Sequence, residues 1–273
     1  MKKIISLLLS LAMLLTITSG LNLTAYADVQ TGKCGDNVTY SLDTSTGVLT
    51  ISGTGKMKDY SGEDSPFYQN SNIKSVIIEN GVTSIGNLAF SSCNSLIEVS
   101  LPSSIISLGV SAFSGCENLA SVTVSDDLPY VGGRAFEKTK WLNSQPDGVV
   151  YIGESAYGYK GNMPKNTELS LKSGITNISG YAFYEEKNLT SVKIPETVNR
   201  IGNWAFLDCE GLKNVNIPDG VKRIESWTFS NCSSLTNITV PDSVTVLDGL
   251  AFSYCTNLKN IELSKNLTEI GMG

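Results

Sequence analysis

The sequence contains no histidine among its 273 residues. Ser-His-Asp and Cys-His catalysis, imidazole metal sites and histidine pH switches all need that side chain, so its absence excludes them together. The adjacent acids Asp126-Asp127 and Glu185-Glu186 are weak catalytic candidates, because sequence neighbours on a strand point in different directions and no matching acid accompanies them. We therefore expect no enzyme, no catalytic residue, and no cofactor or metal site.

Beyond the first 27 residues the chain also lacks any stretch apolar enough to cross a bilayer. The start, MKKIISLLLSLAMLLTITSGLNLTAYA, has two lysines, then an apolar run of about fourteen residues, then Ala-Tyr-Ala. This order is typical of a secretory signal peptide, here cleaved after Ala27, and the run is short of the ~18 residues that a spanning helix needs. We predict a secreted or cell-surface protein with no membrane span in the mature chain.

Positive charge is scarce as well. The formal net charge is −6, and it becomes −8 once the leader is removed, because the leader carries two lysines and no acid. An acidic surface argues against nucleic acid and anionic membrane as electrostatic partners.

What the sequence does contain is a strict repeat. Seven phenylalanines recur at one constant interval, except for a single step that is close to two intervals long. They are Phe90, Phe113, Phe136, Phe183, Phe206, Phe229 and Phe252, and the long step runs from the third to the fourth. A fixed period of about 23 residues predicts a solenoid, in which each coil buries its apolar edge against the next.

Each repeat unit has the same internal plan. It opens with the alternation L-x-x-V-x-I, which predicts a half-buried strand, and in four units a proline ends that strand. A second short apolar pair and a bend glycine follow, and A-F-x-x-C is expected to form one short helical or 3₁₀ turn. We predict a mainly β repeat solenoid with parallel side-chain ladders such as Val192, Val215, Ile238 and Ile261.

The combined pattern, L-x-x-V-x-I-P followed by V-x-x-I-G-x-x-A-F-x-x-C, resembles the BspA-like branch of bacterial leucine-rich repeat proteins. Two more stretches are similar to segments that accompany it, GKCGDNVTYSLDTSTGVLTISGTGKMKDY and WLNSQPDGVVYIGESAYGYKGNMP. The resemblance implies a secreted or surface-displayed protein, often associated with adhesion or host-protein binding, and it implies no catalytic residue.

The period divides the chain into segments. We predict a signal peptide (1–27), an N-terminal β-hairpin cap and polar bridge (28–72), a first repeat block (73–140), a hairpin insertion (141–165) and a second block (166–273). The last coil stops before its A-F-x-x-C, so we expect that the natural gene continues or that the chain is a fragment. The inserted hairpin is expected to leave the stack, either as a spacer with a packing role or as a binding loop that presents Tyr151, Tyr157 and Tyr159.

Five of the six cysteines occupy one repeat position, three residues after the phenylalanine: Cys93, Cys116, Cys209, Cys232 and Cys255. Stacked neighbours would have parallel Cβ vectors, which suits a ladder of small buried thiols better than disulfides. Thr139 and Glu186 fill the slot in other coils, and Cys34 has no evident partner. A metal site is disfavoured further because C-x₂-C spacing is missing.

Two surfaces are candidates for binding. The outward face of the first strands carries Lys193, Lys213 and Asn216 among small polar residues, and such a flat sheet suits an extended protein ligand. The row two residues before each phenylalanine carries Tyr181, Trp204 and Trp227, beside Arg200, Lys222 and Arg223. That row is either an aromatic binding strip or a semi-buried packing row.

These surfaces support two functional hypotheses. The first is an extracellular interaction protein that binds host or neighbouring-cell proteins as an adhesin. The alternative is a carbohydrate-binding or targeting module of a larger secreted assembly, which would use the aromatic strip.

Overall fold

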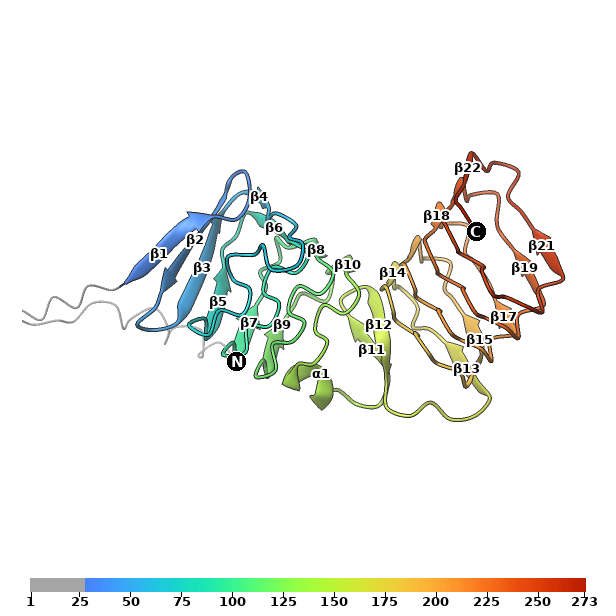
Figure 1. The fold of residues 1–273 in the computed structure, drawn as a ribbon, viewed down its shortest axis with the longest axis horizontal. Coiled ribbons are helices and arrows are strands. Elements are labelled where there is room, and N and C mark those ends of the chain that lie inside the picture. The colour runs from blue at the N-terminus through green and yellow to red at the C-terminus, as the bar shows by residue number, and fades with distance from the viewer. Residues whose placement is uncertain (1–27) are drawn as a thin grey trace, which may run out of the picture.

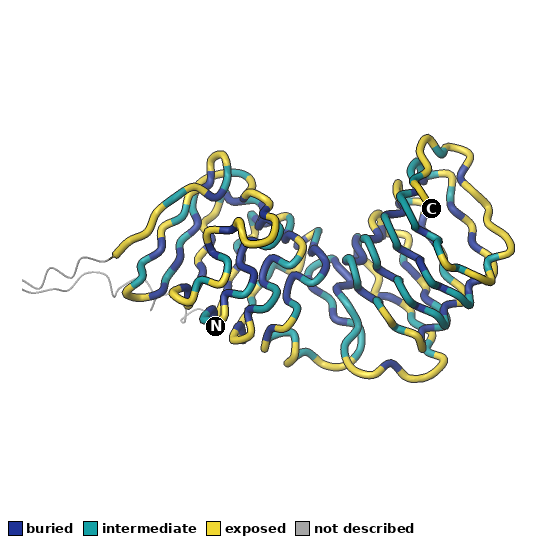
Figure 2. The backbone as a smooth tube through the Cα atoms, in the orientation of Figure 1, coloured by how far each residue is buried: buried dark blue, intermediate teal, exposed yellow. Residues whose placement is uncertain are grey.

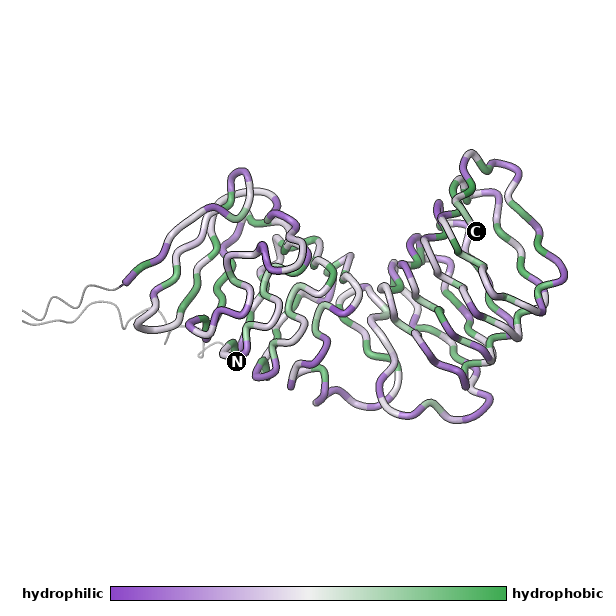
Figure 3. Tube along the Cα trace, viewed as in Figure 1, coloured by the Kyte–Doolittle hydropathy of each residue, from purple (hydrophilic) through white to green (hydrophobic). Residues whose placement is uncertain are grey.

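The computed structural model describes residues 28–273, so the predicted signal peptide lies outside the described residues. The described chain is a mainly β solenoid that is bent into two stacks, which diverge on either side of the hairpin formed by β11 (Gly148–Ile152) and β12 (Ser155–Lys160) (Figure 1). Buried and hydrophobic segments recur from coil to coil inside both stacks (Figures 2 and 3). The predicted fold class is confirmed.

The predicted N-terminal hairpin is confirmed and is extended by one strand. β1 (Val29–Lys33), β2 (Val38–Asp43) and β3 (Val48–Gly53) form an antiparallel cap, and β1 was not predicted. β3 pairs in parallel with β5 (Ser75–Ile78), so the cap supplies the first rung of the repeat sheet.

Each coil contributes one strand to each of two faces. The first-strand face is made of β5, β7 (Glu98–Ser100), β9 (Ser121–Thr123), β13 (Thr167–Ser170), β15 (Leu189–Lys193), β17 (Asn214–Val215), β19 (Asn237–Thr239) and β21 (Asn260–Glu262). The second-strand face is made of β4 (Gly55–Lys56), β6 (Val82–Ile85), β8 (Ser107–Leu108), β10 (Tyr130–Val131), β14 (Asn177–Ile178), β16 (Arg200–Ile201), β18 (Arg223–Ile224), β20 (Val246–Leu247) and β22 (Glu269–Ile270).

The rungs follow the predicted period. Val192 lies opposite Val215, and Ile238 lies opposite Ile261, so each side chain meets the equivalent one in the next coil. The predicted ladder is nevertheless interrupted, because β17 and β19 belong to separate sheets.

Buried phenylalanine rings stack along the axis of each block. Phe206 lies between Phe183 and Phe229, with ring centroids 5.2 and 5.3 Å away. Phe67 was missed in the predicted row, although it precedes Phe90 by one full period and stacks on it at 5.0 Å. The segment predicted as a polar bridge therefore includes an additional rung of the core.

The predicted helical or 3₁₀ turn at A-F-x-x-C is wrong. The chain forms consecutive tight turns in which the residues two before and two after the phenylalanine adopt positive φ, such as Trp204 at 59° and Asp208 at 61°. Because of these left-handed residues, the N–H group of every second residue in the turns points along the solenoid axis toward the next coil. The N–H groups of Trp204, Phe206 and Asp208 accordingly donate to the carbonyls of the next coil over 3.2, 2.9 and 3.0 Å.

The five cysteines of the repeat position form the predicted ladder, and all six cysteines are free. The thiol of Cys209 donates to the carbonyl of Phe183 over 3.0 Å, and Cys232 bonds Phe206 in the same way over 3.3 Å. Burial raises the pKa of the Cys209 thiol well above its ordinary value, and it raises the pKa of Cys34 to about 11.

The insertion forms the predicted hairpin, but the expectation that it leaves the stack is wrong. It begins with a short helix, α1 (Lys140–Ser144), and then β12 pairs in parallel with β14 as a further rung. Tyr157 is only 6% exposed, and its hydroxyl accepts a hydrogen bond from the N–H of Phe136 at 2.8 Å. This placement supports the packing interpretation of the hairpin.

The insertion divides the apolar core into two clusters, one covering residues 34–157 and the other 156–251. The blocks meet closely at Gly133 and Gly180, where a Cβ on Gly133 would stand 2.4 Å from the Gly180 carbonyl oxygen. Glycine is therefore required at this contact.

We expect Phe206→Ala to lower the free energy of unfolding by about 3–5 kcal/mol, because it leaves a ring-sized cavity between two stacked neighbours. Phe252→Ala should cost less, since Phe252 is half-buried and stacks on Phe229 alone. Chemical denaturation of both variants measures the difference, and equal losses would contradict axial stacking as the source of stability.

Glu186 occupies the cysteine slot of its coil, and burial raises the pKa of its carboxyl to about 7 from the ordinary 4.5. Between about pH 4.5 and pH 7 the folded state therefore binds more protons than the unfolded state does. The stability that Glu186 contributes is complete below about pH 4.5 and is lost as the pH rises through 7. We expect Glu186→Gln to flatten this fall in unfolding free energy. The exposed neighbour variant Glu185→Gln is the control, and an unchanged pH profile in Glu186→Gln would refute the assignment.

Candidate functional site

The first-strand face of the second block presents small polar side chains to solvent. One outward row is Ser191, Asn214, Asn237 and Asn260, and the next is Lys193, Asn216, Thr239 and Glu262. The predicted residues Lys193 and Lys213 are exposed here, and neither makes an ion pair within residues 28–273.

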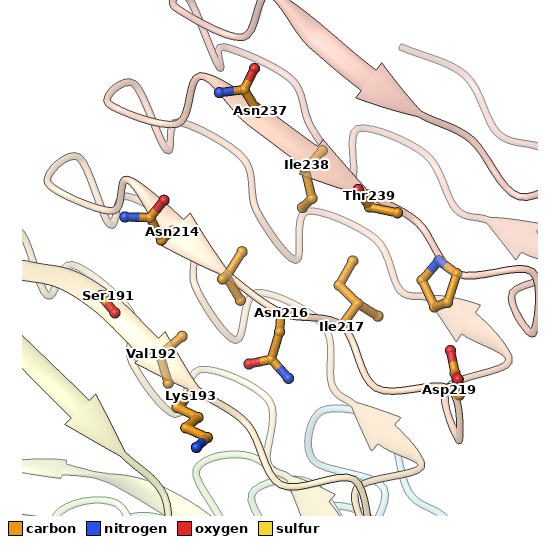
Figure 4. A pocket seen from close by; sticks show the side chains of 12 residues that line it. Ser191, Val192, Lys193, Asn214, Asn216, Ile217, Asp219, Asn237, Ile238 and Thr239 are labelled. Atoms are coloured by element: carbon orange, nitrogen blue, oxygen red, sulfur yellow. The ribbon is translucent and has the colours of Figure 1, made fainter.

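The sheet opens between β17 and β19. β15 is bonded to β17 and β19 to β21, but no ladder joins β17 to β19. A groove of about 610 Å³ lies at this opening, with Lys193, Asn216 and Thr239 among its polar lining residues and buried Val192 and Ile238 among its apolar ones (Figure 4). We call it the β17–β19 groove.

Asn216 replaces a main-chain contact at the end of the β15–β17 ladder. Its side-chain amide accepts from the N–H of Ile194 and donates to the Ile194 carbonyl, both at 2.9 Å. At the equivalent place in another coil a main-chain hydrogen bond joins the two strands, since the N–H of Val240 donates to the Glu262 carbonyl at 2.8 Å. Asn216 lines the groove as predicted, but its amide is already used within the protein.

The edge of β19 exposes main-chain groups to the groove. Val240 donates to β21 and the Thr236 carbonyl accepts from Asn260, so these even-numbered residues face β21. Peptide groups alternate in direction along a strand, so Asn237 and Thr239 direct their N–H and C=O toward β17, where residues 28–273 provide no ladder.

The predicted aromatic row exists, but Tyr181 is covered and Trp204 is stacked on it. Tyr181 and Trp204 stack with centroids 4.8 Å apart, and the guanidinium carbon of Arg134 lies 3.7 Å from the centroid of Tyr181. Trp227 has the same positive φ and is half-buried, as Trp204 is. Sequence reasoning missed Arg134, although it stands two residues before Phe136 and hence in this row.

The basic residues predicted beside the row are mostly engaged. Arg200 Nε lies 3.0 Å from Glu225 Oε1, and its guanidinium carbon lies 4.5 Å from the Tyr130 ring centroid. Arg223 pairs with Asp248, whereas Lys222 is exposed.

Six of the nine predicted binding residues fall into two groups, and Trp227, Lys222 and Arg223 line neither of the two cavities concerned. Tyr181, Trp204 and Arg200 line one small cavity of about 60 Å³. Lys193 and Asn216 line the β17–β19 groove, and Lys213 precedes β17. Neither of these two cavities contains members of both groups.

The family model for the BspA type leucine-rich repeat region matches residues 63–187 and 176–273, in six copies. No curated protein matches the chain.

Solved structures also resemble it. A leucine-rich repeat protein from Eubacterium ventriosum is 21% identical, with 89% of this chain and 93% of that one covered and a TM-score of 0.41. The pneumococcal vaccine antigen PcpA is 17% identical, with 90% and 85% covered and a TM-score of 0.45. A leucine-rich cell surface protein from Faecalibacterium prausnitzii is 20% identical, with 86% and 94% covered and a TM-score of 0.37.

We expect hydrogen exchange to reveal the open edge of β19. The amides of Asn237 and Thr239 should exchange at least tenfold faster than the amide of Val240, which lies on the same segment and donates a hydrogen bond to the Glu262 carbonyl of β21. Exchange read by NMR at single amides makes Val240 the internal control. Equal protection along residues 237–240 would show that the ladder is closed.

Proposed function

Because the chain belongs to the BspA-type leucine-rich repeat family, we propose that it is a secreted or cell-surface protein that binds other proteins. The observation that carries the proposal is the β17–β19 groove, where an exposed polar rim surrounds an apolar floor on an otherwise flat strand face. Adhesion to host or neighbouring-cell proteins is the role that such a surface would serve.

The proposed location is supported by the leader-like sequence of residues 1–27. Within the part of the chain that the structure describes, no helix is both long and apolar enough to cross a membrane.

The strand face is a better candidate than the aromatic row. A platform that stacks on a ligand needs a free ring face, and both faces of Tyr181 are covered, by Arg134 and by Trp204. Lys193 and Lys213, in contrast, hold uncompensated charge at an exposed surface. Glycan binding therefore has less support than protein binding.

We expect the double variant Lys193→Glu/Lys213→Glu to weaken binding to an extracellular protein at least tenfold, because charge reversal at the rim removes electrostatic complementarity. The probes are a panel of purified extracellular matrix proteins and, beside it, a glycan array. Lys138→Glu/Lys165→Glu is the matched control, since it changes the net charge equally at exposed positions outside the groove.

Binding to proteins that is lost in the first variant and kept in the control supports the proposal. Binding to glycans alone, abolished by Trp204→Ala/Trp227→Ala, would overturn it in favour of a carbohydrate-binding module.

A further inference from the structure

We infer that the β17–β19 groove binds an extended, acidic peptide segment of the partner, and that main-chain hydrogen bonds to the edge of β19 hold it. The inference rests on the proposed protein-binding function and specifies the part of the partner that enters the groove. Three features of the groove lead to it: its backbone, its lining and its charge.

The backbone supplies hydrogen-bonding groups without partners. Asn237 and Thr239 direct their N–H and C=O groups into the opening, and β17 does not receive them. A main-chain donor or acceptor without a partner costs free energy unless water or a ligand satisfies it. An extended peptide presents donors and acceptors at the same spacing along its own backbone, which is the basis of recognition by strand addition.

The opening is the one break in the first-strand face of the second block, residues 166–273. On the first-strand face of the second block, β13, β15 and β17 are hydrogen-bonded in sequence, and β19 is bonded to β21. The turns behind the groove stay closed, because Phe206 N–H donates to Thr228 and Phe229 N–H donates to Ala251 at 2.9 Å each. The coils are thus held together at the turns while their first strands separate, so the groove is a fixed part of the fold.

The lining suits alternate side chains of an extended segment. Successive side chains of a strand point to opposite sides, so every second one would point into the groove. The apolar floor there is Val192, Val215, Ile217 and Ile238. The side chains between them would face the polar rim and solvent.

The charge at one end of the groove favours an acidic peptide. Lys193 lines the groove and has no carboxylate partner among the ion pairs of residues 28–273. The only acid in the lining is Asp219, at the far end. A carboxylate of the peptide would therefore lie beside the Lys193 ammonium group.

The test uses the protein spanning residues 28–273 and a phage-displayed library of random linear dodecapeptides as the probe. We expect the selected peptides to be rich in Asp and Glu. We also expect them to lose binding to the variant Thr239→Trp, whose larger side chain fills the groove. Ser100→Trp is the matched control, because Ser100 occupies the equivalent outward position on β7, whose ladder is closed on both sides. Circular dichroism shows whether each variant is folded.

A second measurement isolates the main-chain contacts. Each amide of a synthetic selected peptide is N-methylated in turn, which removes one donor and leaves the side chain unchanged. We expect at least a tenfold loss of affinity at alternate residues and little change at the residues between them.

If the peptides fail to bind Thr239→Trp but keep their affinity after N-methylation at every position, the main-chain inference is overturned and the proposed function stays intact. Selected peptides that bind Thr239→Trp as well as they bind the unmodified protein would overturn the groove as their site. If the lysine variant described above also leaves binding to matrix proteins unchanged, the proposed function fails separately.

Discussion

The fold depends on the hydrogen bonds that run along the axis through the A-F turns. Three ladders could join one coil to the next, but both strand ladders are broken at the coil of residues 212–234, between β16 and β18 and between β17 and β19. The turn ladder continues across that coil, from Trp204 N–H to Ser226 and from Trp227 N–H to Gly249. Positive φ at Trp204 and Trp227 is what points these amides along the stack, and it is strained for bulky residues. The packed phenylalanine rings beside the turns over-determine this backbone and hold it in place.

The same turns explain why the aromatic row became part of the scaffold where the two blocks meet. The inserted hairpin interrupts the core, so contacts other than buried aliphatic packing must join the blocks. Arg134 of the first block covers Tyr181 of the second, and Arg200 of the second covers Tyr130 of the first. These reciprocal cation–π contacts are stronger when they are partly desolvated, as they are beside the half-buried Tyr181 and Trp204. A ring that is used in this way has little surface left for a ligand.

How much the sequence predicts follows from which interactions are periodic. Strands, phenylalanine stacking and the thiol ladder return at the same interval, so one coil predicts the next, and even the missed Phe67 obeys that interval. The turn conformation was not predictable, because positive φ is usually signalled by glycine and here falls on Trp, Arg and Ser. The outward position of Lys193 follows from strand alternation, whereas Lys213 stands before β17 and its exposure does not follow from that alternation. The groove between β17 and β19 does not follow from it either, because both strands follow the same repeat pattern and yet no ladder joins them.

The missing ladder between β17 and β19 matters for recognition. A solenoid whose ladders are complete offers a partner only side chains, because each inner main-chain group is paired with the neighbouring coil. Where the ladder between β17 and β19 is missing, β19 keeps main-chain groups free, and the strand face acquires an edge between two neighbouring coils. An exposed edge usually invites aggregation. Here the edge lies in a recess between two coils of the same chain, with the unpaired Lys193 in its lining, so the recess suits a narrow, extended segment that carries a carboxylate near this lysine.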